Sequence, residues 1–108
     1  MNYEIVHTEE FSRHIKQLSK KHPSLKNDYA AFLISLQTNP LRVNAPGKNC
    51  YKVRLKITSK KTGKSGGARI ITYVRIELKR IVLPDIYDKA DKDSLSDKEL
   101  FALIKKVE

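Results

Sequence analysis

The stretch YKVRLKIT, Tyr51–Thr58, decides the fold of this chain. Apolar residues alternate with polar ones throughout it, and a period of two is typical of a β-strand with one buried face. Three of its four polar residues are the cations Lys52, Arg54 and Lys56. The stretch therefore predicts a sheet that has an apolar core on one face and a row of positive charge on the other.

A second alternating stretch, Ala68–Ile76, follows after a lysine- and glycine-rich segment, Lys60–Gly67, that reads as a hairpin loop. Its even-numbered residues are expected to pack. If the two strands pair, the odd-numbered Arg69, Tyr73 and Arg75 lie on the same face as the cation row, and we expect all of these side chains to be in solvent.

Positive charge is concentrated in this part of the chain. Gly47–Arg80 contains 11 Lys or Arg residues and a single acid, whereas Met1–Pro46 carries a net charge of +2 and Ile81–Glu108 a net charge of −2. The formal net charge of the 108 residues is +10. A cation on the outer face of a strand is usually only solvated, but this many on one folded surface favour a polyanionic partner, most simply nucleic acid.

Two amphipathic helices and a short strand are predicted before the cationic strands. Tyr3–His7 reads as the strand, and Thr8 caps the first helix, which Pro23 ends. A second helix runs from Leu25 to Asn39-Pro40, and Arg42–Asn49 is expected to be a loop. The apolar stripes of the two helices are Phe11, Ile15 and Leu18, and then Leu25, Tyr29, Phe32, Leu33 and Leu36.

The last part of the chain predicts a central strand and a final helix. Ile81–Tyr87 is nearly continuously apolar, and Pro84 within it predicts a bulge or interruption. Ser96 and Glu99 form a capping box that opens the helix. Its core side is expected to hold Leu100, Leu103, Ile104 and Val107, and Phe101 is also placed on a core face.

The predicted order is strand, helix, helix, three strands and helix. This is an α+β fold in which the helical hairpin packs on a mostly antiparallel four-stranded sheet. The length is enough for one domain, 1–108, with one core. A lone cysteine, Cys50, allows no intramolecular disulfide and is expected to be a small core residue. The three histidines, His7, His14 and His22, are expected at the surface.

No apolar run approaches the length of a membrane span, and the N-terminus is polar within a few residues. We therefore expect a cytoplasmic protein without a membrane partner. The sequence suggests no cofactor and no metal site.

A cationic face could also act on RNA without a metal. The ribose 2′-hydroxyl can itself attack the neighbouring phosphate if a protein orients it, helps to remove its proton and stabilises the charge that develops. Arginine can bridge two phosphate oxygens, and a tyrosine such as Tyr73 offers a ring on which a base can stack.

Three segments resemble the RelE/HigB-type toxins of type II toxin–antitoxin systems, in the RelE/ParE superfamily. Gly66-Gly67-Ala68-Arg69 followed by Ile70–Tyr73 is similar to their Gly-Gly-x-Arg segment and the strand after it. Cys50–Leu55 resembles their first cationic strand, and Ile86–Ser96 resembles their last strand and the lead-in to the C-terminal helix. The element order agrees as well, so the resemblance spans nearly the whole chain.

The resemblance implies a toxin that cuts mRNA in the ribosomal A site as a metal-independent endoribonuclease, inhibits translation, and is silenced by a cognate antitoxin. It implies that Arg69 stabilises the scissile phosphate and that Lys52 and Arg54 bind phosphate and assist proton removal. The residues expected to hold RNA and the ribosome are Lys56, Tyr73, Arg75, Tyr87, Lys89 and Lys92.

The chain departs from the RelE pattern at two positions. Ala90 stands where that branch has a further arginine, and the stacking tyrosine of the C-terminal region is missing. Either Tyr73 or Tyr87 substitutes for it, or catalysis is weaker. Two alternatives stay open, a ParE-like gyrase inhibitor that is not an enzyme and a basic RNA- or ribosome-binding module. The general base is not identified.

Overall fold

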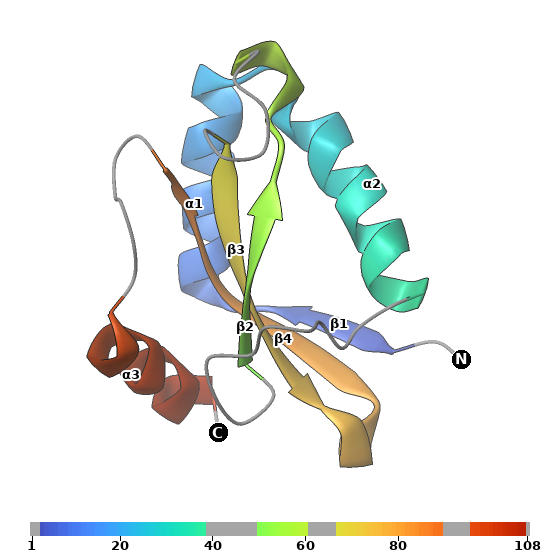
Figure 1. Cartoon of the computed structure of the whole chain (residues 1–108), viewed down its shortest axis with the longest axis vertical. Coiled ribbons are helices and arrows are strands. Elements are labelled where there is room, and N and C mark those ends of the chain that lie inside the picture. The colour runs from blue at the N-terminus through green and yellow to red at the C-terminus, as the bar shows by residue number, and fades with distance from the viewer. Residues whose placement is uncertain (1–2, 39–49, 61–66, 90–95, 108) are drawn as a thin grey trace.

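The computed structural model describes residues 3–38, 50–60, 67–89 and 96–107. Within these residues, three helices and four strands follow one another along the chain. Figure 1 shows how they are arranged. The elements, in order, are β1 (Glu4–His7), α1 (Glu9–Lys21), α2 (Leu25–Thr38), β2 (Cys50–Leu55), β3 (Ala68–Arg75), β4 (Arg80–Asp88) and α3 (Asp97–Val107). Short 3-10 turns, Thr58–Lys60 and Ile76–Leu78, follow β2 and β3. The predicted element order is confirmed. The expected loop Arg42–Asn49 and residues 61–66 of the expected loop Lys60–Gly67 lie outside the described residues.

The four strands form one sheet in the order β1-β4-β3-β2. β2 pairs with β3 and β3 with β4 in antiparallel fashion, as expected of a hairpin-connected run. β1 pairs in parallel with β4, so that the first strand of the chain lies beside the last. The mostly antiparallel α+β fold is confirmed, and the sheet is mixed because of this single parallel pair.

A bulge interrupts β4 at Pro84, as the sequence predicts. Ile71 of β3 pairs with Asp85, but Tyr73 pairs with Val82, so β4 has one residue more than β3 between the two pairs. Proline has no N–H to give to the ladder, which makes a bulge the place for it in a central strand. The extra residue allows Leu83 and Ile86 to reach the same core.

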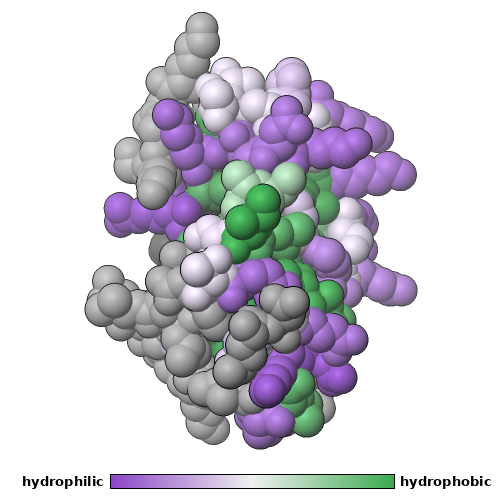
Figure 2. Space-filling model, turned by 90° about the vertical axis from the view of Figure 1, so that its right-hand side faces the viewer, coloured by the Kyte–Doolittle hydropathy of each residue, from purple (hydrophilic) through white to green (hydrophobic). Residues whose placement is uncertain are grey.

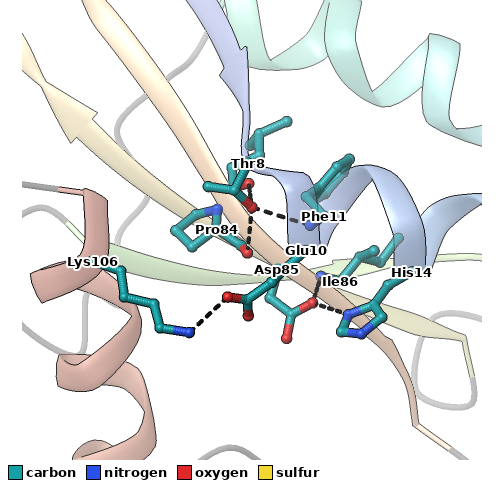
Figure 3. A network of polar contacts seen from close by, with 9 residues as sticks. Thr8, Glu10, Phe11, His14, Pro84, Asp85, Ile86 and Lys106 are labelled. Atoms are coloured by element: carbon teal, nitrogen blue, oxygen red, sulfur yellow. Dashed lines mark hydrogen bonds and ion pairs between the residues drawn. The ribbon is translucent and has the colours of Figure 1, made fainter.

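Thr8 ties the start of α1 to this bulge, as Figure 3 shows. Its hydroxyl donates to the Pro84 carbonyl at 2.9 Å and accepts from the Phe11 N–H at 3.0 Å, which caps the helix. Asp85 holds the other side of the bulge, because its Oδ1 accepts from the Ile86 N–H at 2.8 Å. The bulge is therefore fixed by contacts from both its own strand and α1.

The helical hairpin α1–α2 covers one face of the sheet. Figure 2 views the molecule from the side of α2, where apolar (green) atoms occupy the centre of the face and hydrophilic (purple) side chains surround them. The buried residues of this core come from both helices and from β2, β3 and β4, and the even-numbered residues of β3 pack here as expected. They are Phe11, Leu18, Leu25, Phe32, Leu36, Tyr51, Leu55, Ile57, Ala68, Ile70, Val74, Ile81, Leu83 and Ile86.

α3 packs on the opposite face of the sheet. The predicted capping box opens this helix, since the Glu99 N–H donates to Ser96 Oγ at 3.1 Å and the Ser96 N–H donates to Glu99 Oε1 at 3.2 Å. Lys106 Nζ also reaches Glu10 Oε1 of α1 at 2.7 Å (Figure 3). The second, smaller core contains Cys50, Ile71, Tyr73, Val82, Tyr87, Leu100 and Ile104. No helix among the described residues is long and apolar enough to cross a membrane.

Candidate functional site

Arg54, Arg69 and Tyr87 form a row across three neighbouring strands. Arg54 of β2 pairs with Arg69 of β3, and Arg69 pairs with Tyr87 of β4. Residues directly opposite each other across a sheet have Cβ atoms about 4.5–5.5 Å apart and point to the same face. The pairing therefore brings two arginines and a tyrosine together on the face that α3 partly covers.

The two arginines give this row its electrostatic character. Like charges directly opposite each other across a sheet are unfavourable, and an anion between them removes that cost. Arg54 is exposed, whereas only 9% of Arg69 is exposed and its Nη1 donates to the Ala68 carbonyl at 3.2 Å. Arg54 thus reaches solvent while the head group of Arg69 is held against the sheet, and both suit the binding of a phosphate.

Three more of the predicted cations surround this row. Lys52 pairs with Ile71, one step along the sheet on the same face, and its side chain is exposed. Lys56 follows β2 and is exposed as well. Lys89 comes directly after β4, and its N–H donates to the Gly67 carbonyl at 3.0 Å. Lys92 lies outside the described residues.

Tyr73 and Arg75 are on the predicted face but lie away from the row. Tyr73 pairs with Cys50 and is four residues from Arg69 along β3, about 13 Å in an extended strand. The Arg75 guanidinium lies over the Tyr73 ring, 5.8 Å from its centroid, and Arg75 Nε donates to Glu77 Oε1 at 2.6 Å. These two residues belong to the other end of the sheet.

The expectation that this whole face stays in solvent is wrong. Arg69 is 9% exposed, Tyr73 8% and Tyr87 9%. The reason is α3, whose Leu100 and Ile104 need an apolar surface and find it on the odd-numbered residues of β3 and their neighbours. Only the β2 end of the face keeps its cations exposed.

The aromatic side chains differ from expectation for the same reason. Tyr73 and Tyr87 are both packed in the α3 cluster, so neither presents an open ring face for stacking. Phe101, expected on a core face, is 50% exposed, because α3 turns Leu100 and Ile104 to the sheet and the residue after Leu100 points elsewhere. Phe101 is the one aromatic residue of α3, Asp97–Val107.

Gly67, two residues before Arg69, determines how closely the start of β3 approaches β2. A Cβ atom on Gly67 would lie 2.1 Å from the Leu55 carbonyl oxygen, which is far inside van der Waals contact. Only glycine allows the two backbones to come this close. The second glycine of the Gly-Gly-x-Arg pattern therefore has a structural role, since it permits the pairing that places Arg69 opposite Arg54.

The turn after β2 is anchored by Asp28 of α2, a role that no pattern in the sequence indicates. Thr58 donates to Asp28 from both its N–H (2.9 Å) and its hydroxyl (2.6 Å), and the Ser24 hydroxyl donates to the same carboxylate at 2.8 Å. Burial raises the pKa of Asp28, but these hydrogen bonds outweigh burial and the net pKa is lowered. The carboxylate holds the end of the cationic strand against α2.

The histidine side chains also form contacts that were not expected of surface residues. His14 Nδ1 lies 2.5 Å from Asp85 Oδ1, and His22 Nε2 lies 3.0 Å from Asp88 Oδ2, so both pairs link α1 to β4. His7 contacts the Tyr29 hydroxyl, and burial lowers the pKa of His7. Their partners are 22 to 71 residues away in sequence, which is why the sequence did not indicate them.

Cys50 is the small core residue that the sequence predicts. It is fully buried in the α3 cluster, and burial raises the pKa of its thiol to about 11, with Lys52 acting in the opposite direction. A thiol in this state is not a nucleophile at neutral pH.

Solved structures of RelE toxins share this architecture. A free-state double-arginine mutant of Escherichia coli RelE matches with a TM-score of 0.64 and 16% identity over 100% of both chains. The isolated E. coli RelE toxin matches with a TM-score of 0.52 and 19% identity over 98% of this chain and 99% of that one. The chain has the RelE fold.

The same fold occurs in a toxin–antitoxin complex. In the RelBE2 complex of Mycobacterium tuberculosis, the matched chain is 18% identical with a TM-score of 0.57, over 84% of this chain and 95% of that one. No family model and no curated protein matches the sequence. At these identities the RelE fold is what the comparison establishes, and the activity depends on the residues of the site.

Proposed function

We propose that this chain is the toxin of a toxin–antitoxin pair and cleaves mRNA on the ribosome as a metal-independent endoribonuclease. The observation that carries the proposal is the cross-strand pair Arg54–Arg69 on a RelE fold, with Lys52 one step away on the same face. A cation pair built into a sheet is a rigid site for a phosphate that gains charge during reaction.

The proposed reaction is an internal transfer at phosphorus. The ribose 2′-oxygen attacks the adjacent phosphorus, its proton passes to a base, and the bond from phosphorus to the 5′-oxygen breaks as that oxygen takes up a proton. Arg54, which is exposed, meets the phosphate first, and Arg69 stabilises the additional charge in the transition state. Lys52 binds the phosphate and assists removal of the proton.

The other predicted residues have supporting roles in this proposal. Lys56, after β2, and Lys89, after β4, hold the RNA backbone near the two ends of the row, and Lys92 continues that basic segment. Tyr87 shapes the floor of the site beside Arg69, with which it pairs. Arg75, which is partly exposed, contacts RNA or the ribosome at the far end of the sheet, and the buried Tyr73 ring supports its guanidinium there. We place the protein in the cytoplasm, because its substrate is there.

Induction of Arg69→Ala in cells tests the proposal. The wild-type chain is expected to arrest growth and to leave mRNA cut at A-site codons, whereas the variant relieves the arrest, since removing one transition-state contact typically costs about a hundredfold or more in rate. Mapping of mRNA 5′ ends before and after induction measures the cleavage.

Arg80→Ala is the matched control, because Arg80 forms a surface pair with Glu4 on β1 and is away from the row. It should stay as toxic as the wild type. Full toxicity of Arg69→Ala would contradict the assignment, and DNA damage with intact mRNA would point to gyrase instead. RNA binding with a steep salt dependence and no cleavage would reduce the chain to a binding module.

A further inference from the structure

The outer surface of α2 is an apolar ridge on a highly charged protein. The ten residues from Tyr29 to Thr38 include no charged residue, although 31% of the chain is charged. Ile34 is 72% exposed, and the neighbouring Ala30 and Ala31 are exposed as well. Figure 2, seen from this side, shows the apolar patch in the middle of the face with hydrophilic side chains around it.

Cations line a groove on each side of this ridge. Between α2 and α1, a groove of about 320 Å³ has a floor that includes Phe11 and Ile15 and carries Lys16 and Lys26. Between α2 and β2, a second groove of about 330 Å³ is lined in part by two more cations, Arg54 and Lys56. Asp28 is the one acid among the described residues that line either groove, and it is engaged by Thr58 and Ser24.

An apolar ridge between two cationic grooves fits one kind of partner. We propose that the outer surface of α2 docks an acidic amphipathic segment of a partner protein, whose apolar side chains cover Ile34 and whose carboxylates meet the lysines and arginine in the grooves. The inference rests on the proposed function in one respect, because the partner we assign to it is the antitoxin.

Charge selects this partner over two others. A second copy of the chain would bring another net charge of +10 to a surface that is already cationic, and like charge opposes such an association. RNA would find phosphate ligands in the grooves, but the exposed isoleucine ridge between them offers neither a charge nor an aromatic ring for nucleic acid. An acidic amphipathic segment has apolar side chains to cover the ridge and carboxylates to pair with the cations of the grooves.

The position of the second groove gives docking a consequence. Arg54 lines that groove and is also half of the Arg54–Arg69 pair. Arg54 is exposed and β2 is the edge strand of the sheet, so a partner on α2 that extends around this edge can place a carboxylate on the guanidinium, where it competes with the phosphate of RNA. Such a partner would inhibit the site from the β2 edge.

The test uses the purified full chain and the protein encoded by the reading frame beside its gene. Ile34→Glu is expected to weaken that complex at least tenfold, about the effect of a single buried hot spot, because it places a carboxylate where apolar contact is needed. Ala30→Glu, one turn away, should act in the same direction. Neither side chain supports the core, and an unchanged melting temperature confirms that both variants fold.

Leu78→Glu is the matched control, because Leu78 is a 50% exposed apolar residue outside α2, in the turn Ile76–Leu78. It should change affinity less than twofold. Lys26→Glu should slow association and reduce its salt dependence, while Lys105→Glu, an exposed cation on α3, should do neither. Hydrogen exchange in the complex should protect Leu25–Thr38.

Several results would overturn the inference. Equal effects of Ile34→Glu and Leu78→Glu, protection confined to other elements, or no complex with the neighbouring protein would each do so. So would a dimer of the chain alone that Ile34→Glu dissociates. The inference also fails if Ile34→Glu reduces the affinity for a short oligouridine as much as it reduces the affinity for the neighbouring protein. Growth arrest by the chain without its partner tests the nuclease separately, and Ile34→Glu should keep that arrest.

Discussion

The two faces of the sheet differ in what covers them and in what they contain. The hairpin face buries 14 residues of the described chain in one core, without a cation among them. The α3 face buries seven, beside a row of arginines and lysines, and a single helix covers it. The hairpin face therefore provides most of the hydrophobic stabilisation, while the α3 face gives up apolar area to keep a cationic site.

Core truncation on the hairpin face should have the largest effect. Phe11 is fully buried between β1, α1 and α2, so Phe11→Ala is expected to reduce the free energy of unfolding by about 3–5 kcal/mol. Ile104→Ala on the α3 face should cost about 2 kcal/mol, at the low end for such changes, because a helix at the edge of the fold can relax around the cavity. Urea denaturation measures both, and equal losses would contradict the comparison.

Gly67→Ala tests how the hairpin strands support the site on the other face. The new methyl group would meet the Leu55 carbonyl, so β2 and β3 must separate where Arg54 and Arg69 pair. We expect a loss of about 1–3 kcal/mol together with a loss of toxicity larger than the lost stability explains. Ser19→Ala, a polar surface change on α1, is the control and should alter neither quantity. A Gly67→Ala chain that is less stable but fully toxic would separate Gly67 from the site.

The smallest of the three effects is expected from Asp28, and it should appear in the pH dependence of the free energy of unfolding. Its pKa in the folded chain lies below the ordinary value of 3.8, so the carboxylate stabilises the fold above that pH and loses this contribution as pH falls through the lower, folded pKa. Asp28→Asn should remove that part of the acid dependence and cost less than about 1 kcal/mol at neutral pH, since the group is only partly buried and solvent screens its charge. Thermal melts at pH 7 and below pH 4 compare the two chains, and identical acid profiles would show that Asp28 contributes nothing.

The sequence predicted the hairpin face more completely than the α3 face. Alternation in Tyr51–Thr58 and Ala68–Ile76 depends on local periodicity, which a single sequence shows directly. The bulge at Pro84 and the caps at Thr8 and Ser96 follow from local backbone chemistry, and all three are confirmed.

What the sequence did not show depends on which elements meet in space. The same apolar stripe of α3 could cover either face of the sheet, so the burial of Arg69, Tyr73 and Tyr87 was not foreseen. The contacts of Asp28 with Thr58 and of His22 with Asp88 join residues 30 and 66 positions apart. For the site, the sequence placed Arg54 and Arg69 on one face, and pairing then set them directly opposite each other.

The parallel pairing of β1 with β4 also constrains how the chain is made. Glu4 pairs with Arg80, and Thr8 binds the Pro84 carbonyl, so the first strand has no partner until β4 has left the ribosome. Contacts between such distant residues slow folding, because a long loop must close before they form. During synthesis the hairpin α1–α2 can form early, but its sheet is completed only by β4. A nascent chain is therefore without the completed sheet behind Arg54 and Arg69 for most of its translation. Under the proposed function, that interval keeps the chain inert on the ribosome that makes it.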